Sequence, residues 1–134
     1  MNTAYRVWDG EQMHYWDDEG LSLELMGNEW VLWRDFGDGC RVSIAESHEE
    51  GTALMWGTGQ KDENGKMIYP GDGVEFEERN LAQAFAGCDG PDFIRKKRII
   101  FIAKGRHNVP EGFIKNLKVI GNVYETPKLL EGAE

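Results

Sequence analysis

Apolar and polar residues alternate along much of the N-terminal half of the chain. Leu21, Leu23 and Leu25 are separated by Ser22 and Glu24. Successive side chains of a strand point to opposite faces of a sheet, so this period of two predicts a half-buried strand. Similar short patterns, divided by turns such as the one at 35–39, predict more strands. They involve Tyr5 with Val7, Met13 with Tyr15, Trp30–Trp33, Arg41–Ile44 and Leu54–Trp56.

Two dipeptides in the middle of the chain predict tight turns. Asn64-Gly65 is the pair that most favours a two-residue hairpin of type I′, in which both residues take positive φ. Pro70-Gly71 suits a type II turn, because Pro presets the first φ and Gly supplies the positive second one. We expect a short strand at Met67–Tyr69 between these turns and another strand that starts at Val74.

The C-terminal half contains one helix candidate and two apolar strands. Asn80 is a suitable N-cap, and Gly87 is suited to end a helix that lies between them. A basic cluster, Arg95–Arg98, leads into the apolar run Ile99–Ala103, which predicts a strand and is much shorter than the roughly 20 residues that cross a membrane. The remaining expectations are a loop at 105–112, a strand at 117–124 with a bulge at Gly121, and a loose tail at 128–134.

Many short strands, one short helix and frequent turns indicate a mainly β fold, either a barrel or a rolled sheet. The length of 134 residues suits a single domain that spans 1–134, either alone or with a small appended subdomain, and that buries its own core. The high glycine content, 17 residues, favours tight turns over long helices. We find no internal repeat and no linker in this pattern.

Charge narrows the range of partners. The formal net charge is −9, and affinity for nucleic acid comes largely from Lys and Arg on phosphates, so non-specific binding to DNA, RNA or anionic lipid is disfavoured. Two interpretations of the acidity stay open, a surface kept soluble by charge and an acidic surface that docks on a basic partner.

Cysteine content and the N-terminal sequence bear on location. Cys40 and Cys88 are far apart in the sequence, and no dense disulfide framework exists, so we expect two free thiols. Residues 1–6 contain no apolar stretch of the kind found in a secretory signal. We therefore expect a location in the cytoplasm of a bacterial host and no association with a membrane.

Three stretches of the sequence resemble the signatures of the YopX-like family of bacteriophage and prophage proteins. The N-terminal stretch is Arg6-Val7-Trp8-Asp9, and the C-terminal stretch is Val119–Glu125 with Pro127 and Leu129-Leu130. The central stretch contains Thr58-Gly59, Lys61-Asp62, Asn64-Gly65-Lys66, Ile68-Tyr69, Gly71-Asp72 and Val74. The three stretches follow the family's order and together span nearly the whole chain.

The resemblance implies a fold and a genomic context. The fold is a mainly β one with an SH3-like barrel element, and the context is a phage or prophage genome. The chain departs from the family pattern at Gly57, Gln60, Pro70 and Gly73, which softens the apolar pattern around the central hairpin. Residues 77–116 match no family pattern and are interpreted as an inserted segment.

The residues that carry the resemblance are interpreted as structural. Asp and Asn bond to nearby backbone in turns, and Gly supplies unusual backbone angles, so most of these positions need no ligand to explain them. The set comprises Trp8, Asp9, Thr58, Gly59, Asp62, Asn64, Gly65, Tyr69, Gly71, Asp72, Gly121, Asn122, Tyr124, Glu125 and Pro127.

The sequence offers no assembled catalytic or metal-binding set. A calcium loop that starts at Asp62 fails, because its sixth position is Met67 and its twelfth is Gly73, where the motif needs Gly and Glu. A nuclease set of Asp92 with a Glu-x-Lys pair lacks its second carboxylate, because Ile102 stands two residues before Lys104. His14, His48 and His107 share no metal-ligand spacing. We expect no enzyme activity, no cofactor and no metal.

The leading hypothesis is an accessory protein that binds a host or phage protein or assembles with further copies of itself. Its first rival is nucleic-acid binding through the basic cluster Arg95, Lys96, Lys97 and Arg98, with Phe93 and Phe101 nearby. A second rival is an enzyme built from the scattered carboxylates Asp17, Asp18, Asp35 and Asp38. The acidity also suggests a DNA mimic, whose carboxylates would need the spacing of phosphates.

Overall fold

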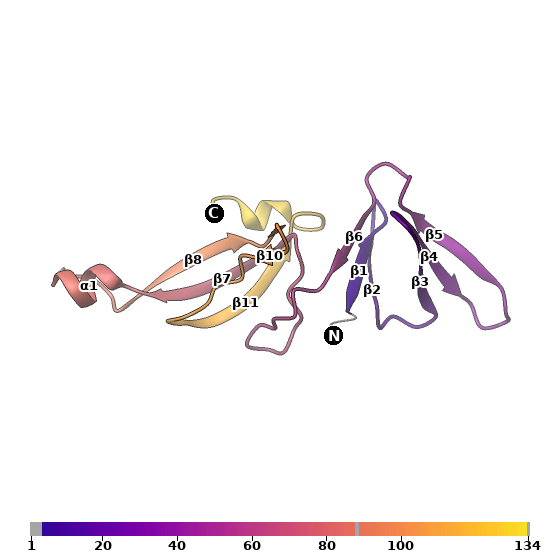
Figure 1. Ribbon diagram of the computed structural model, residues 1–134. Helices are drawn as coiled ribbons and strands as arrows, with labels where there is room; N and C mark the ends of the chain where they lie inside the picture. Colours follow the sequence, from indigo (N-terminus) through magenta and orange to yellow (C-terminus); the bar gives the residue numbers. More distant parts are fainter. Residues whose placement is uncertain (1–3, 88, 134) are drawn as a thin grey trace. The chain divides into compact units, whose positions relative to one another are not determined.

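The computed structural model describes residues 4–87 and 89–133 and shows a mainly β protein (Figure 1). The chain divides into two compact units, Met1–Gly57 and Thr58–Glu134, called unit 1 and unit 2 below. The prediction of a mainly β fold with one short helix is confirmed. The division falls between the N-terminal and central family signatures, while the interpretation of 77–116 as an insertion in a single domain stays a prediction.

Unit 1 contains a first antiparallel sheet of three short strands. Strand β1 (Tyr5–Trp8) lies in the middle, between β2 (Met13–Tyr15) and β6 (Ala53–Trp56). The turn between β1 and β2 is held by Asp9, whose Oδ1 accepts the backbone N–H groups of Glu11 at 2.8 Å and Gln12 at 2.7 Å. The strands predicted here are all confirmed.

A second antiparallel sheet completes unit 1, with strand order β3 (Leu21–Met26), β4 (Glu29–Asp35), β5 (Arg41–Glu46). Its inward residue Leu32 and the β5 residue Ala45 form a core with Val7 of the first sheet. Apolar side chains from every strand but β2 contact this core, as the alternation predicts. They are Tyr5, Leu21, Leu23, Trp30, Ile44 and Leu54.

Unit 2 is built on three longer strands in the order β11 (Ile114–Asn122), β7 (Asp72–Arg79), β8 (Phe93–Ile99), all antiparallel. Its core contains Val74 and Phe76 of β7 together with Ile68, Ile100 and Val109, which come from loops. Ile68 and Tyr69 are buried, so this part of the central family segment packs into the core despite the departures from the family pattern, whereas Asn64, Gly65 and Lys66 are exposed.

The helix prediction is confirmed at both ends. Helix α1 (Leu81–Ala86) joins β7 to β8; Asn80 Oδ1 accepts the backbone N–H of Gln83 at 3.2 Å, and Gly87 takes a left-handed conformation with φ of 68°. A short side chain with an acceptor oxygen satisfies an N-terminal amide, and a glycine adopts positive φ without strain.

The turn prediction at Asn64-Gly65 is wrong in type. Asn64 is not among the residues with positive φ, and Lys61 and Met67 form only an isolated bridge instead of a strand pair. The two-residue hairpin instead joins β9 (Ile102–Ala103) to β10 (Arg106–His107) through Lys104 and Gly105, with φ of 53° and 74°. The turn is held instead by the side chain of Asp62, which accepts backbone N–H groups of the loop and is described below.

Three other predicted boundaries are corrected. The basic cluster does not precede a strand but forms β8 itself, and the run Ile99–Ala103 is interrupted before β9. Strand β11 starts three residues early, and its second bulge lies between Val119 and Gly121, next to the predicted position. Part of the tail is ordered as a 3-10 helix, η1 (Pro127–Leu130).

The tail is held because Leu130 is buried against β7. A Cβ atom on Gly73 would lie 2.0 Å from Leu130 Cδ2, so only a glycine at this position leaves space for the leucine. A closed barrel, in contrast, does not form over residues 4–87 and 89–133, whose strands make four separate sheets of two or three strands. Such small sheets have too few strands to close on themselves.

Candidate functional site

Asp62 organises the central family segment through backbone contacts. Its Oδ1 accepts the N–H groups of Asn64 and Lys66, both at 2.9 Å, and its Oδ2 accepts the N–H of Val119 on β11 at 3.1 Å. The carboxylate is 8% exposed. Both of its oxygens are therefore engaged in holding the loop and tying it to β11, which is a structural role.

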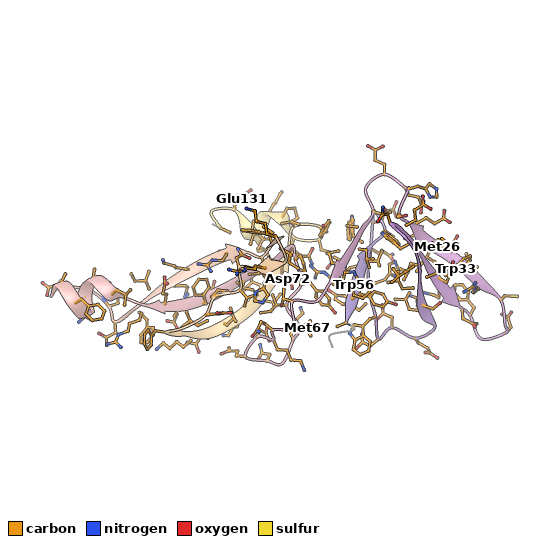
Figure 2. The ribbon with its side chains drawn as sticks, in the orientation of Figure 1. Met26, Trp33, Trp56, Met67, Asp72 and Glu131 are labelled. Atoms are coloured by element: carbon orange, nitrogen blue, oxygen red, sulfur yellow. The ribbon has the colours of Figure 1, made fainter. Side chains whose placement is uncertain are left out.

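The next signature residues fix the turn that starts β7. Tyr69 C=O accepts the N–H of Asp72 at 3.0 Å, and Asp72 Oδ2 accepts the N–H of Tyr69 at 2.8 Å. Gly71 has φ of 92°, as the type II turn at Pro70-Gly71 requires, so this prediction is confirmed. Asp72, labelled in Figure 2, is almost completely buried.

The C-terminal signature forms a similar backbone cap. Asn122 Oδ1 accepts the N–H groups of Tyr124 at 2.9 Å and Glu125 at 2.8 Å, and its Nδ2 donates to Glu125 Oε1. A Cβ atom on Gly121 would lie 2.1 Å from Thr126 Oγ1. Pro127 then begins η1. Earlier in unit 2, Thr58 Oγ1 donates to Ile68 C=O at 2.8 Å, and Gly59 and Gly65 have φ of 87° and 80°.

The N-terminal signature lies in unit 1, where Asp9 contacts His14. The guanidinium of Arg34 has only donors and lies 3.3 Å from His14 Nδ1, so Nδ1 accepts and the opposite nitrogen, Nε2, donates to Asp9 Oδ2 at 2.8 Å. Burial alone raises the pKa of Asp9, but hydrogen bonds from His14 and from the Gln12 and Glu11 amides outweigh it and lower this pKa below its ordinary value. Trp8 ends β1 just before.

The scattered carboxylates of unit 1 also serve turns. Asp18 Oδ2 accepts the N–H of Tyr15, Asp35 Oδ1 that of Gly37, and Asp38 Oδ1 that of Cys40, at 2.9, 2.8 and 3.1 Å. Asp17 is exposed. Over the described residues, no group of three or more His, Cys, Asp or Glu side chains is arranged to hold a metal ion. Cys40 is a free, exposed thiol, whereas Cys88 lies outside the described residues.

The basic cluster lies on β8, opposite the acidic residues of β7. Lys97 is paired with Glu75 and Arg95 with Glu77 in the strand register. Lys96 Nζ lies 2.7 Å from Glu78 Oε2, Arg95 Nε lies 3.7 Å from Glu75 Oε1, and Arg98 is stacked over Phe76. The cluster is thus partly neutralised within its own sheet, a feature that the sequence pattern did not reveal.

A set of exposed apolar side chains lies at the end of this sheet, around α1, and was not predicted. The set consists of Leu81 and Phe85 of α1, Ile94 of β8 and Phe113 beside the start of β11, and is called the apolar tip below. Phe113 C=O accepts the N–H of Arg79 at 3.0 Å, so Phe113 lies beside the end of β7, just before the N-cap of α1. Figure 1 shows α1 at the far end of the β7–β8 hairpin.

The two units also differ in charge. Residues 1–57 contain 12 acidic and 3 basic residues, whereas residues 58–134 contain 12 of each, so unit 1 carries the whole net charge of −9. The acidity noted in the sequence is therefore a property of one unit. The basic cluster stands in a unit with no net charge.

The chain is similar to known proteins over nearly its full length. A family model described as YopX protein matches residues 4–131. The SPbeta prophage-derived uncharacterized protein YopX of Bacillus subtilis (strain 168) is 39% identical over 139 residues, with 100% of both chains covered. No helix in the described part of the chain is long and apolar enough to cross a membrane.

Solved structures show the same relationship. The crystal structure of protein yopX from Bacillus subtilis is similar with a TM-score of 0.72 and 36% identity, over 98% of this chain and 100% of that chain. The crystal structure of protein EF1440 from Enterococcus faecalis is similar in fold, with a TM-score of 0.51 and 22% identity, over 96% of this chain and 97% of that one.

Proposed function

The chain belongs to the YopX family, and on this premise we propose that it is a phage or prophage accessory protein that acts by binding another protein. The proposal includes a location in the bacterial cytoplasm and no enzyme activity. The signature carboxylates support a non-enzymatic role, since Asp62 and Asp72 hold backbone amides of the fold. A chemical role would need reactive groups that face a ligand.

The apolar tip is the observation that carries this proposal. Phe85 is 84% exposed and Phe113 is 74% exposed, although both belong to or adjoin regular structure. Clusters of exposed large apolar side chains mark sites of interaction more often than chance positions do. Burial of one such side chain contributes about 1.5–3 kcal/mol, so a partner that covers two or three of them gains a substantial part of the free energy that offsets the cost of association.

The helix at the tip presents its apolar residues in a defined arrangement. Leu81 and Phe85 are four residues apart, so they lie on the same side of α1, and the caps at Asn80 and Gly87 fix both ends of this short helix. Arg79 lies over the Phe113 ring at 6.0 Å. A partially apolar surface with a nearby arginine is typical of the centre of protein interfaces.

Nucleic-acid binding through residues 95–98 is the second candidate function. It is supported by four consecutive basic residues on an edge strand. It is weakened by the glutamates beside Arg95 and Lys96 and by the net charge of −9, which repels a polyanion.

The test compares capture of a partner by three forms of the protein. The wild type, the triple variant Leu81→Ser/Phe85→Ser/Phe113→Ser and the control Phe36→Ser are each used as bait in host lysate, with and without nuclease. Phe36 is a matched control, because it is 67% exposed but lies in unit 1.

We expect one partner that survives nuclease treatment and that only the triple variant fails to capture. Exposed substitutions change the free energy of unfolding by about 0.5 kcal/mol at most, so a thermal melt will show that the triple variant is folded. Equal capture by all three baits would contradict the proposed role of the tip. Capture that only nuclease abolishes would favour the nucleic-acid candidate.

A further inference from the structure

Strand β8 presents an open edge of the unit 2 sheet, which ends in β8 on one side. Across the β7–β8 ladder Ile100 N–H donates to Asp72 C=O at 2.8 Å. Hydrogen-bonded pairs alternate along an antiparallel ladder, so Arg98, Lys96 and Ile94 turn their backbone groups towards β7. The backbone N–H and C=O groups of Arg95 and Lys97 therefore point outwards.

The opposite side of β7 agrees with this assignment. Arg79 N–H donates to Phe113 C=O on the β11 side. The backbone N–H and C=O groups of odd-numbered β7 residues therefore point towards β11, and those of even-numbered residues point towards β8. Among the described residues, no hydrogen bond engages the outward backbone groups of Arg95 or Lys97. The outward C=O of Ile99, in contrast, accepts Asn108 Nδ2 at 3.0 Å, which closes the edge at that end.

The open edge also lies in a concave surface. Arg95, Lys96 and Lys97 line a shallow depression together with Gly132, which follows η1. Gly132 lies beside β8 because Leu130, two residues earlier, is anchored against Gly73. The described lining residues of the depression carry three cationic side chains and no acidic one.

We propose that the β8 edge binds an extended, acidic segment of a partner protein, which adds as a further strand beside Arg95–Lys97. The exposed edge offers alternating donors and acceptors, and a peptide backbone in strand conformation matches both. Phosphates of a nucleic acid accept hydrogen bonds but cannot donate to the C=O groups. The cations then select acidic side chains over others.

The strand pleat defines the spacing of those acidic residues. Arg95 and Lys97 lie on the same face, with Glu75 and Glu77 of β7, and Lys96 lies on the other. Carboxylates at positions i and i+2 of the added segment would stand opposite Arg95 and Lys97. The Arg95 side chain is 71% exposed and 3.7 Å from Glu75, so it is free to shift to an incoming carboxylate at little cost.

A second copy of this chain is a less suitable occupant, because two chains of net charge −9 repel each other. Basic residues on an edge also discourage uncontrolled strand pairing. An acidic segment, in contrast, is attracted by the same basic side chains. The edge at Arg95–Lys97 and the apolar tip share no residue, although Ile94 of the tip directly precedes Arg95 on β8, so the inference does not depend on the proposed role of the tip.

The probe is a labelled ten-residue peptide of alternating Glu and Thr, added to the full chain. We expect saturable binding at low salt and slowing of hydrogen exchange at the Arg95 and Lys97 amides. The variant Arg95→Glu/Lys97→Glu should weaken binding about tenfold or more. The matched control Lys115→Glu/Lys118→Glu makes the same charge change on β11 and should bind within about threefold of the wild type.

Two further probes separate the alternatives. A peptide of the same sequence with N-methyl groups on alternate residues lacks the donors of a strand edge and should not bind. Equal binding of the N-methylated peptide, no binding of either peptide, binding only of a single-stranded oligonucleotide, or concentration-dependent dimers that use this edge would each overturn the proposal. The Leu81→Ser/Phe85→Ser/Phe113→Ser variant should still bind the peptide, which distinguishes this site from the tip.

Discussion

The two units of this chain use their polar residues in different ways. Unit 1 has 12 acidic residues against 3 basic ones, and several of its carboxylates hold single turn amides at the surface. Unit 2 is balanced in charge, but its signature residues Asp62 and Asp72 are buried and engage the backbone of several segments. Acidity therefore describes the surface of unit 1, whereas the recognisable family signature is largely the internal framework of unit 2.

This difference teaches that the same residue type carries different information in each unit. An aspartate in a buried turn constrains the backbone, so its replacement destabilises the fold. An exposed aspartate contributes mainly to the electrostatic potential around the protein. The candidate interaction surfaces, the apolar tip and the β8 edge, belong to unit 2 and use neither class of residue. Functional inference from the signature alone would therefore select residues that stabilise the fold.

Core truncation is expected to have the largest effects and to compare the units directly. Phe76→Ala removes a fully buried ring from the core of unit 2, and Leu32→Ala removes a buried side chain from the core of unit 1. Losses of about 3–5 and 2–5 kcal/mol are typical for such changes. Hydrogen exchange by residue should show lost protection on β7 for the first variant and on β4 for the second; the reverse pattern would contradict the assignment of the two cores.

Replacement of Asp62 tests the internal framework. Asp62→Ala leaves three backbone N–H groups, those of Asn64, Lys66 and Val119, without their acceptor. Hydrogen bonds to charged groups contribute about 1.5–3 kcal/mol each and are not additive, so we expect unit 2 to lose about 2–4 kcal/mol in chemical denaturation. The neighbouring Glu63→Ala, at an exposed position, should cost no more than about 0.5 kcal/mol. Equal effects would show that Asp62 has no special role.

The sequence predicted the framework better than the surfaces. Strands β1 to β6, helix α1 with its caps, and the turn at Pro70-Gly71 follow from local patterns, because alternation and turn chemistry act over a few residues. The type I′ turn predicted at Asn64-Gly65 was wrong in type, because the side chain of Asp62 and its contact with Val119 overrule the local preference. The described strands form no closed barrel. The SH3-like element that the resemblance implies is therefore not confirmed and stays a prediction.

The surfaces were predicted less well for a different reason, although the basic cluster at 95–98 was recognised as a candidate. The neutralisation of Lys96 by Glu78 joins residues 18 positions apart, and the burial of Leu130 depends on Gly73 at the other end of unit 2. Neither contact leaves a periodic trace in the sequence. The exposure of Phe85 and Phe113 gave no signal either, because a phenylalanine in a short helix or after a glycine is usually interpreted as part of the core.

The pH dependence of unit 1 should reveal the smallest effect, through Asp9. The pKa of Asp9 lies below its ordinary value of 3.8, despite the opposing effect of burial, because His14 and two amides donate to the carboxylate. A carboxyl group with a lowered pKa in the folded state adds stability above its unfolded pKa, and this stability is lost as the pH falls through the folded pKa. Asp9→Asn should therefore be less stable than the wild type at neutral pH, and the difference should close as the pH falls below 3.8. Denaturation monitored by tryptophan fluorescence across this range measures the difference.

The control Asp17→Asn removes the same charge at an exposed position. An identical pH profile for both variants would attribute the effect to net charge and would contradict a specific role for the Asp9–His14 contact.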